Sequence, residues 1–373
     1  ARATSNWALQ KLISTLATSD FHNLTTHWVD FTTAMVSNDV LDIAADGDVV
    51  LICAASEKAE ISYRLRVSSA VLNLASPVFK ALLSPKFREG NALAANGYVE
   101  VPLPDDAAEP MIMMLKALHF DPDIMKHIPE SLEILTTSIS ADKYDCSIAM
   151  GHSAFYWISI RSEEFAIDEI HDLLVASNHF RQENLFNKLC KDLIMHSPQL
   201  IEASGAAKAA GLEELFANLE EARTLDLKEV RIFLEDALSY EAGYENEMGS
   251  TGCARSSFCF YEARRTQALL KKLYQMSIWP SNELESQSLS ECIDKLRDIG
   301  TDWLKGIEPC SKKCDGMGFI DASGTVAKFQ EQADEIEREQ GHFCLHCVRQ
   351  GTAQRIAPEN ACEHSQDSSG MEE

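Results

Sequence analysis

Two cysteine pairs near the end of the chain carry the residue types best suited to chemistry. Cys310 and Cys314 are separated by three residues, and Cys344 and Cys347 by two. Structural Zn²⁺ sites use four thiolate or imidazole donors in a tetrahedron. A segment with helical periodicity lies between the pairs and could bring them together, so the sequence predicts a structural zinc site at these four cysteines. Four further donors lie nearby in the sequence: His342, His346, Cys362 and His364.

A plainer interpretation competes with this one. The two pairs are 29 residues apart, a spacing that fits no standard zinc finger, and Cys253 and Cys259 form a further loose pair. Ordinary thiols in a helical module are the alternative to a metal site. The chain has eleven cysteines, an odd number, and no apolar signal segment near residue 1. These features favour a reducing, intracellular compartment, cytoplasm or nucleus, over a disulfide framework.

Tyr144 and Cys146 stand close together in the sequence and raise the question of nucleophilic catalysis. No base is spaced to activate them, and a buried cysteine beside a packed tyrosine is more often structural. The sequence also lacks the phosphate-loop, dinucleotide-binding, nucleophile-elbow and His-Glu-x-x-His motifs. We therefore predict no catalytic residues, no bound cofactor apart from the candidate zinc, and a protein that is not an enzyme.

The elements that organise the chain lie in residues 46–90. Apolar residues 49–54 predict a strand buried on both faces, and alternation over residues 61–67 predicts a half-buried strand that pairs with it as a hairpin. Ser68 or Ser69 is expected to cap a first helix. Pro77 closes that helix and suits the first turn of a second.

This order of elements resembles the core of the BTB/POZ domain, and looks most like fungal BTB-domain proteins. The resemblance is carried by the segments DGDVVLI, RLRVSSAVLNLASPVFKALL, PKFREG, VEVPLPDD and ISADKYDC, which span residues 46–146. It implies an α+β BTB/POZ fold, a small β-sheet flanked by a helical cluster. We expect a mainly α-helical C-terminal region to follow it.

The resemblance also implies interface residues. In the family the first core helix contributes to a dimer face, which corresponds here to Ser69, Val71, Leu72 and Leu74, together with Phe79. Substrate adaptors of cullin-type ubiquitin ligases carry a hydrophobic-x-Glu element after the second helix. Phe87 and Glu89 match that element. These seven residues are the predicted protein interface.

The remaining chain is predicted to be mostly helical. A small-residue loop is expected at 91–97, and a short strand at 98–101 that Pro102 and Pro104 stop. Helical periodicity then recurs to residue 196, with a methionine-rich face in 108–120 that we interpret as core. The second half carries four apolar stripes at helical spacing, of which the clearest joins Leu289 to Trp303 and Ile307. The predicted domains are an N-terminal extension at 1–38, a BTB/POZ domain at 39–146, its helical extension at 147–205, a helical module with the cysteine pairs at 206–364, and a disordered tail at 365–373.

Composition narrows the function classes. The formal net charge is −25, which repels nucleic-acid phosphates, and no run of 18 apolar residues could cross a membrane. We predict a protein–protein interaction scaffold, a homo- or hetero-oligomer that most simply is a homodimer through its BTB domain, without nucleic-acid or membrane partners. The alternatives are a cullin substrate adaptor and a transcription-associated regulator.

Overall fold

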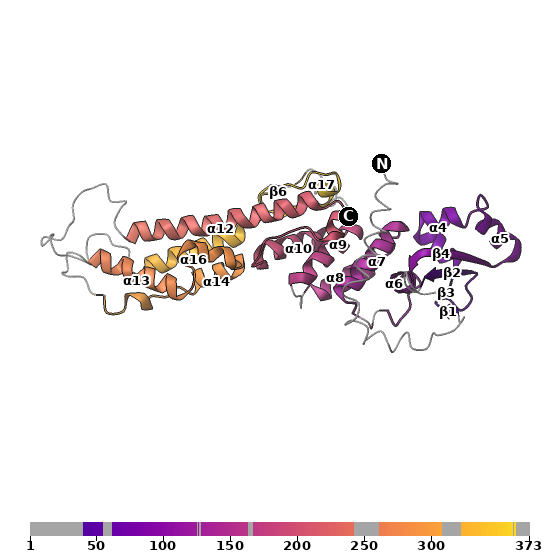
Figure 1. Ribbon diagram of the computed structural model, residues 1–373, viewed down its shortest axis with the longest axis horizontal. Coiled ribbons are helices and arrows are strands. Elements are labelled where there is room, and N and C mark those ends of the chain that lie inside the picture. The colour runs from indigo at the N-terminus through magenta and orange to yellow at the C-terminus, as the bar shows by residue number, and fades with distance from the viewer. Residues whose placement is uncertain are drawn as a thin grey trace, which may run out of the picture. The chain divides into compact units, whose positions relative to one another are not determined.

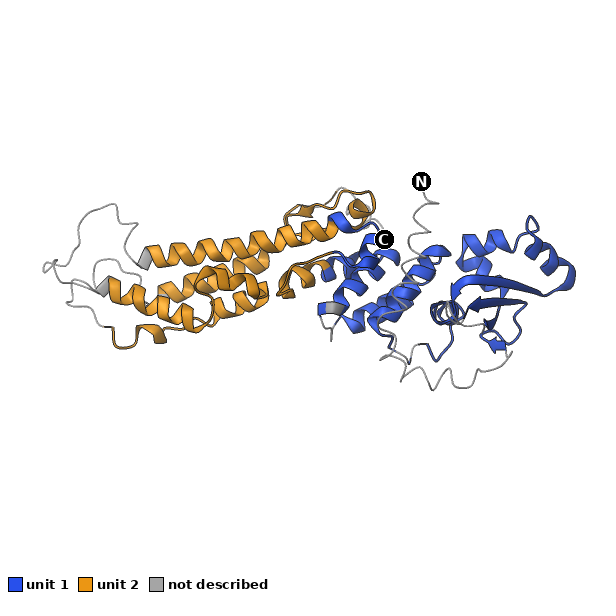
Figure 2. Cartoon of the chain, in the orientation of Figure 1, with its two compact units in different colours: residues 1–189, 203–214 blue, residues 190–202, 215–373 orange. Residues whose placement is uncertain are grey.

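The computed structural model (Figure 1) divides into two compact units (Figure 2), each described here by itself. Unit 1 comprises residues 1–189 and 203–214, and unit 2 comprises residues 190–202 and 215–373. The division falls near the predicted boundary at residue 205. However, residues 190–202 belong to unit 2, and residues 203–214, which follow them, belong to unit 1. The described residues are 40–54, 62–124, 126, 128–162, 167–241, 261–307, 322–360 and 362. The predicted extension at 1–38 and tail at 365–373 lie outside them.

Unit 1 contains a four-stranded sheet in the order β1-β3-β2-β4. The strands are β1 (Val40–Asp42), β2 (Val49–Ala54), β3 (Ser62–Val67) and β4 (Val99–Ala107). Strands β2 and β3 pair antiparallel, as predicted, and the structure places Leu51 opposite Leu65. Strand β4 runs parallel to β2 at the edge of the sheet. Strand β2 lies centrally, and its first three residues are fully buried, which explains its continuous apolar run.

Two local predictions after residue 87 are wrong. The expected loop at 91–97 is the helix α5 (Arg88–Asn96), because its small residues are largely alanines, which favour helix, and Gly97 ends it with φ 70°. Strand β4 continues through both prolines to Ala107. An edge strand tolerates Pro102, and the register with β2 shifts between Leu103 and Ala107, the segment that contains Pro104, so neither missing N–H breaks the ladder.

Helices α3 (Ser69–Ala75) and α4 (Pro77–Leu82) follow the hairpin with Pro77 at the first position of α4, as predicted. Asp48, rather than a serine side chain, secures the start of α3: it accepts hydrogen bonds from Ser69 N at 2.7 Å and Ser69 Oγ at 2.6 Å. Buried Ser76 joins the helices, since its Oγ accepts from Phe79 N at 2.9 Å and donates to the carbonyl of Tyr144 at 2.5 Å. The orientation of both helices is thus set by buried polar contacts.

The rest of unit 1 is helical, with α6 (Ala108–Leu118), α7 (Ser131–Lys143), α8 (Gly151–Arg161), α9 (Ile167–His179), the first half of α10 (Glu183–His196) and α11 (Gly205–Ala209). The methionines of α6 are buried, which confirms them as core. Within the part of the chain that the structure describes, no helix is both long and apolar enough to span a lipid bilayer.

Unit 2 is built on the long helix α12 (Glu213–Glu241), with α13 (Tyr261–Gln275), α14 (Leu289–Arg297) and α16 (Ala322–Arg338). Phe233 of α12 packs edge-on against Phe329 of α16 at 4.9 Å between ring centroids. The predicted single stripe to Ile307 is wrong, because α14 ends at Arg297 and Trp303 belongs to a separate 3₁₀ turn, Asp302–Leu304. With a four-stranded sheet in unit 1, a two-stranded sheet in unit 2 and many helices, the described chain has a mixed, mainly helical α+β architecture.

Candidate metal centre

A short hairpin at the end of unit 2 positions the candidate site. Strand β5 (His342–Phe343) pairs antiparallel with β6 (Arg355–Ile356), and the one-turn helix α17 (Leu345–Arg349) lies between them. Gly341 enters the hairpin where a Cβ atom would lie 2.4 Å from the carbonyl oxygen of Ile356, so only glycine fits. Phe343 is buried and fixes the strand against the unit's core.

Three cysteine side chains converge at this hairpin. Cys344 immediately precedes α17, Cys347 lies within it, and Cys362 follows β6. Their Sγ atoms all lie within 4.8 Å of one another, and the Sγ atoms of Cys347 and Cys362 are 3.4 Å apart. The first two thiols share a face because they are three residues apart at a helix start. The group could therefore hold a metal ion through three sulfur donors.

The structure brings together only part of the predicted ligand set. Cys344 and Cys347 are in the group, whereas Cys310 and Cys314 lie outside the described residues, as does His364. Cys362, which the sequence offered only as a nearby further donor, is the third member. The described histidines are not members: His346 Nε2 lies 2.8 Å from Gln350 Nε2. The sequence signal for this third ligand was a cysteine that follows the C-x2-C pair. Whether that cysteine reaches the pair depends on how the hairpin folds.

Crowding of the thiols affects their ionisation. Partial burial first, and then hydrogen bonds and charge from Cys362 and Cys344, raise the pKa of Cys347 to about 12. Three thiolates placed this close repel one another when no cation is present. A divalent cation reverses that preference and deprotonates coordinating thiols.

Polar contacts join the hairpin to α12. Both oxygens of the buried Asp226 carboxylate accept from Arg355, Oδ1 from Nη1 at 2.8 Å and Oδ2 from Nη2 at 3.0 Å. Gln340 Nε2 also donates to Asp226 Oδ2 at 2.9 Å, and Asn218 Nδ2 donates to the carbonyl oxygen of Ala353. We call Asp226, Gln340 and Arg355 the α12 anchor. It holds the cysteine-bearing hairpin against the long helix, and sequence patterns contain no signal for it.

The predicted protein interface in unit 1 is only partly accessible. Leu72 and Phe79 are fully buried, so their prediction as contact residues is wrong: they pack beneath α3 and α4, with the Phe79 ring stacked on Tyr144 at 4.3 Å. Ser69 is bonded to Asp48, and Val71 is half-buried. Leu74, by contrast, is 91% exposed.

The Phe87 to Glu89 element lies at the start of α5. Phe87 is 48% exposed, and its carbonyl oxygen accepts from Asn91 Nδ2 at 3.0 Å. Glu89 is half-buried and lies 3.4 Å from the guanidinium of Arg88. The aromatic side chain is thus available to another protein, while the carboxylate is partly covered.

Tyr144 and Cys146 belong to a buried structural cluster. Asp106 accepts from the Tyr144 hydroxyl at 2.7 Å and from Lys143 Nζ at 2.6 Å. Burial raises the pKa of the Cys146 thiol to about 11, so it is protonated at neutral pH. Burial raises the pKa of Tyr144 also. Neither group is set up as a nucleophile.

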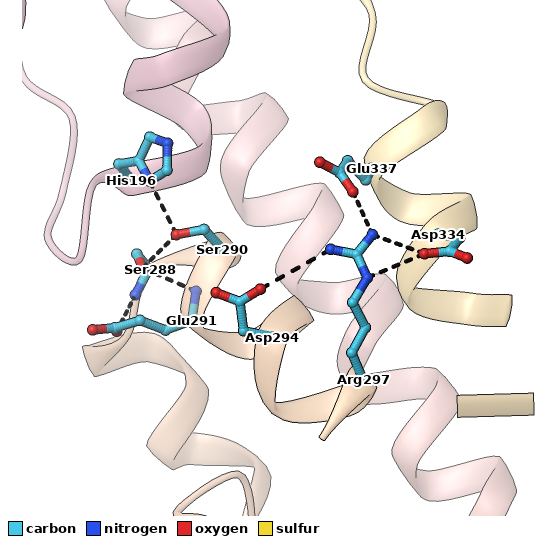
Figure 3. A network of polar contacts seen from close by, with 8 residues as sticks. All are labelled: His196, Ser288, Ser290, Glu291, Asp294, Arg297, Asp334 and Glu337. Carbon is cyan, nitrogen blue, oxygen red and sulfur yellow. Dashed lines mark hydrogen bonds and ion pairs between the residues drawn. The ribbon is translucent and has the colours of Figure 1, made fainter. Parts of the chain in front are cut away.

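A second polar cluster lies on unit 2 between α10, α14 and α16 (Figure 3). It borders an open depression of about 310 Å³. Arg297 pairs there with Asp334 at 2.8 Å and with Glu337, and Ser288 and Glu291 form the capping box that starts α14. His196 Nδ1 lies 3.0 Å from Ser290 Oγ. The contacts of His196 and Arg297 join α14 to α10 and α16, whereas the capping box lies within the start of α14.

Comparison with known proteins adds no relative to this picture: no family model, curated protein or solved structure matches the chain. The BTB/POZ resemblance of residues 46–146 stays a prediction.

Proposed function

We propose that this chain is a non-enzymatic protein-interaction scaffold that self-associates through unit 1. The observation that carries the proposal is the exposure of Leu74, which is 91% exposed on a helix whose both ends are fixed by polar contacts. Val78 on the following helix is also exposed. Exposed apolar side chains that lie together on a surface mark interaction sites, whereas isolated ones are common on any protein. The BTB/POZ resemblance of the same segment supports a second copy as the partner.

The energetic contribution of such a contact is substantial. Full burial of a leucine side chain contributes about 1.5–3 kcal/mol. A two-fold symmetric dimer buries the same residue twice, so Leu74 would contribute from both copies. Leu72 and Phe79 beneath it hold α3 in place, which limits the entropy lost on association.

Light scattering on the full chain tests self-association. The chain mass is 41.4 kDa, and we expect the wild type to run as a dimer or larger species at micromolar concentration. Leu74→Asp should shift it to the monomer mass. Ile148→Asp is the matched control, since Ile148 is 81% exposed in the same unit but lies outside α3 and α4. A wild type at monomer mass, or equal behaviour of both variants, contradicts the proposal.

The second part of the proposal concerns unit 2, where Cys344, Cys347 and Cys362 would bind a structural Zn²⁺. Three sulfur donors within 4.8 Å support it, and a fourth donor would complete the tetrahedron. No described His, Cys, Asp or Glu other than these three belongs to the group. The zinc would tie α17 to the segment after β6 and so close the hairpin.

Metal analysis of protein purified without chelators tests this site. We expect about one zinc per chain, lost in Cys344→Ser and retained in Cys190→Ser, a buried cysteine of the same unit. Zinc below about 0.2 equivalents in the wild type ends the idea. Comparing His364→Ala with the double variant Cys310→Ser, Cys314→Ser identifies which donor completes the site.

A cullin-adaptor role is the second candidate, favoured by the exposure of Phe87. Pull-down with a cullin should recover the wild type better than the double variant Phe87→Ala, Glu89→Ala. Tyr98→Ala, another exposed aromatic of unit 1, is the control. Equal recovery of wild type and double variant removes this role.

A further inference from the structure

One thiol pair in the cysteine group is closer than metal binding requires. The Sγ atoms of Cys347 and Cys362 are 3.4 Å apart, although the residues are 15 positions apart in the sequence. Both residues are half-buried, whereas Cys344 is buried. The pair is therefore in contact through sulfur and partly open to solvent.

The other described cysteines differ from this pair. Cys53, Cys146, Cys190 and Cys292 are all buried within cores. Buried thiols are out of reach of oxidants in solution, so burial separates the accessible Cys347–Cys362 pair from the protected thiols.

From this contact we propose that Cys347 and Cys362 form an oxidisable pair whose disulfide, made by a hydroperoxide, displaces the metal. One thiol takes up an oxygen atom from the hydroperoxide and becomes a sulfenic acid, and the peroxide leaves as water or an alcohol. The second thiol then attacks the sulfenic sulfur, which forms the S–S bond and releases water. Two electrons pass from the thiol pair to the peroxide.

Oxidation removes two of the three sulfur donors of the group. Cys344 then remains as the only described sulfur ligand, and one thiolate does not hold Zn²⁺ in a structural site. The metal release rests on the proposed zinc site, whereas disulfide formation does not need zinc. The α12 anchor and the β5–β6 pairing involve no cysteine, so they hold the hairpin in place during the change.

The test uses the full chain in zinc-loaded and zinc-free forms, treated with hydrogen peroxide. Residue-resolved alkylation and peptide mass spectrometry should show the loss of both the Cys347 and Cys362 thiols as one cross-linked peptide, reversed by dithiothreitol. A chromogenic chelator should report zinc release at the same rate. Cys362→Ser should abolish the cross-link, and Cys190→Ser should leave it unchanged.

The outcomes separate the two proposals. If the wild type takes up no zinc but still forms the Cys347–Cys362 cross-link, the oxidisable pair is supported and the zinc site is refuted. Zinc release without that cross-link, or a disulfide that pairs either cysteine with Cys344, refutes the oxidisable pair and leaves the zinc site standing. Full retention of both thiols after peroxide treatment refutes it as well.

Discussion

Replacing Asp226 by alanine should loosen the cysteine hairpin from α12. The Asp226 side chain is only 7% exposed and accepts three hydrogen bonds, two of them from the guanidinium of Arg355. Breaking a buried ion pair by removing one partner costs about 3–5 kcal/mol, because the remaining charge is left without compensation. The Arg355 side chain is 23% exposed and can turn partly toward water, which lowers the expected cost to about 2–4 kcal/mol.

Glu235→Ala on the same helix is the matched control. Glu235 pairs with Arg231 at 3.0 Å, but both side chains are about half exposed. Exposed pairs four residues apart on a helix contribute about 0.3–0.5 kcal/mol, so this variant should be nearly neutral. The two substitutions remove the same kind of charge from one helix and differ mainly in burial.

Hydrogen exchange measures the effect locally. Opening free energies of peptides covering residues 342–356 should fall by about 2–4 kcal/mol in Asp226→Ala, and stay within about 0.5 kcal/mol of wild type in Glu235→Ala. If the hairpin binds zinc, its affinity for zinc should weaken about tenfold for each 1.4 kcal/mol of lost hairpin stability that zinc binding must restore. Equal, near-zero effects of the two substitutions refute the assignment of Asp226 as the anchor.

Three further predictions concern stability. Burial raises the pKa of Asp172 to about 6, so its ionisation destabilises the fold progressively as the pH rises from about 4 to above 6. Asp172→Asn should therefore stabilise unit 1 by about 1–3 kcal/mol at pH 8. Thermal unfolding measured as a function of pH should show that this gain vanishes below about pH 4. Burial lowers the pKa of His119, whose Nε2 accepts from Ser68 N at 3.0 Å. The unfolded state therefore binds the proton more readily, and wild-type stability should fall as the pH drops below about 6.5, with a shallower slope in His119→Gln. Gly341→Ala forces a Cβ atom against the Ile356 carbonyl oxygen, and it should lower the opening free energy of the hairpin in hydrogen exchange by about 1–3 kcal/mol. Gly211 has a φ of 74° and open space around it, so Gly211→Ala measures the cost of backbone strain alone.

Much of unit 1 followed from local sequence pattern. Apolar alternation predicted the pairing of β2 with β3, and the position of Pro77 predicted the start of α4, because these features depend on residues close in the chain. The errors at Pro102 and Pro104 have the opposite origin. A proline is compatible with a strand only at an edge or a bulge, and that location depends on which strands lie beside it.

The candidate sites likewise combine features that depend on residues close in the chain with features that depend on the fold. The two-residue spacing was enough to predict Cys344 and Cys347 as a pair of candidate metal ligands, because thiols this close along the chain can bind one ion. That Cys362 joins them depends on the fold, because the β5–β6 hairpin returns the chain and Asp226 fixes it on α12. The fold also buried Leu72 and left Leu74 exposed on one short helix. Leu72 and Leu74 are two residues apart and therefore lie on different sides of the helix. Only the surfaces packed against the helix determine which side is covered.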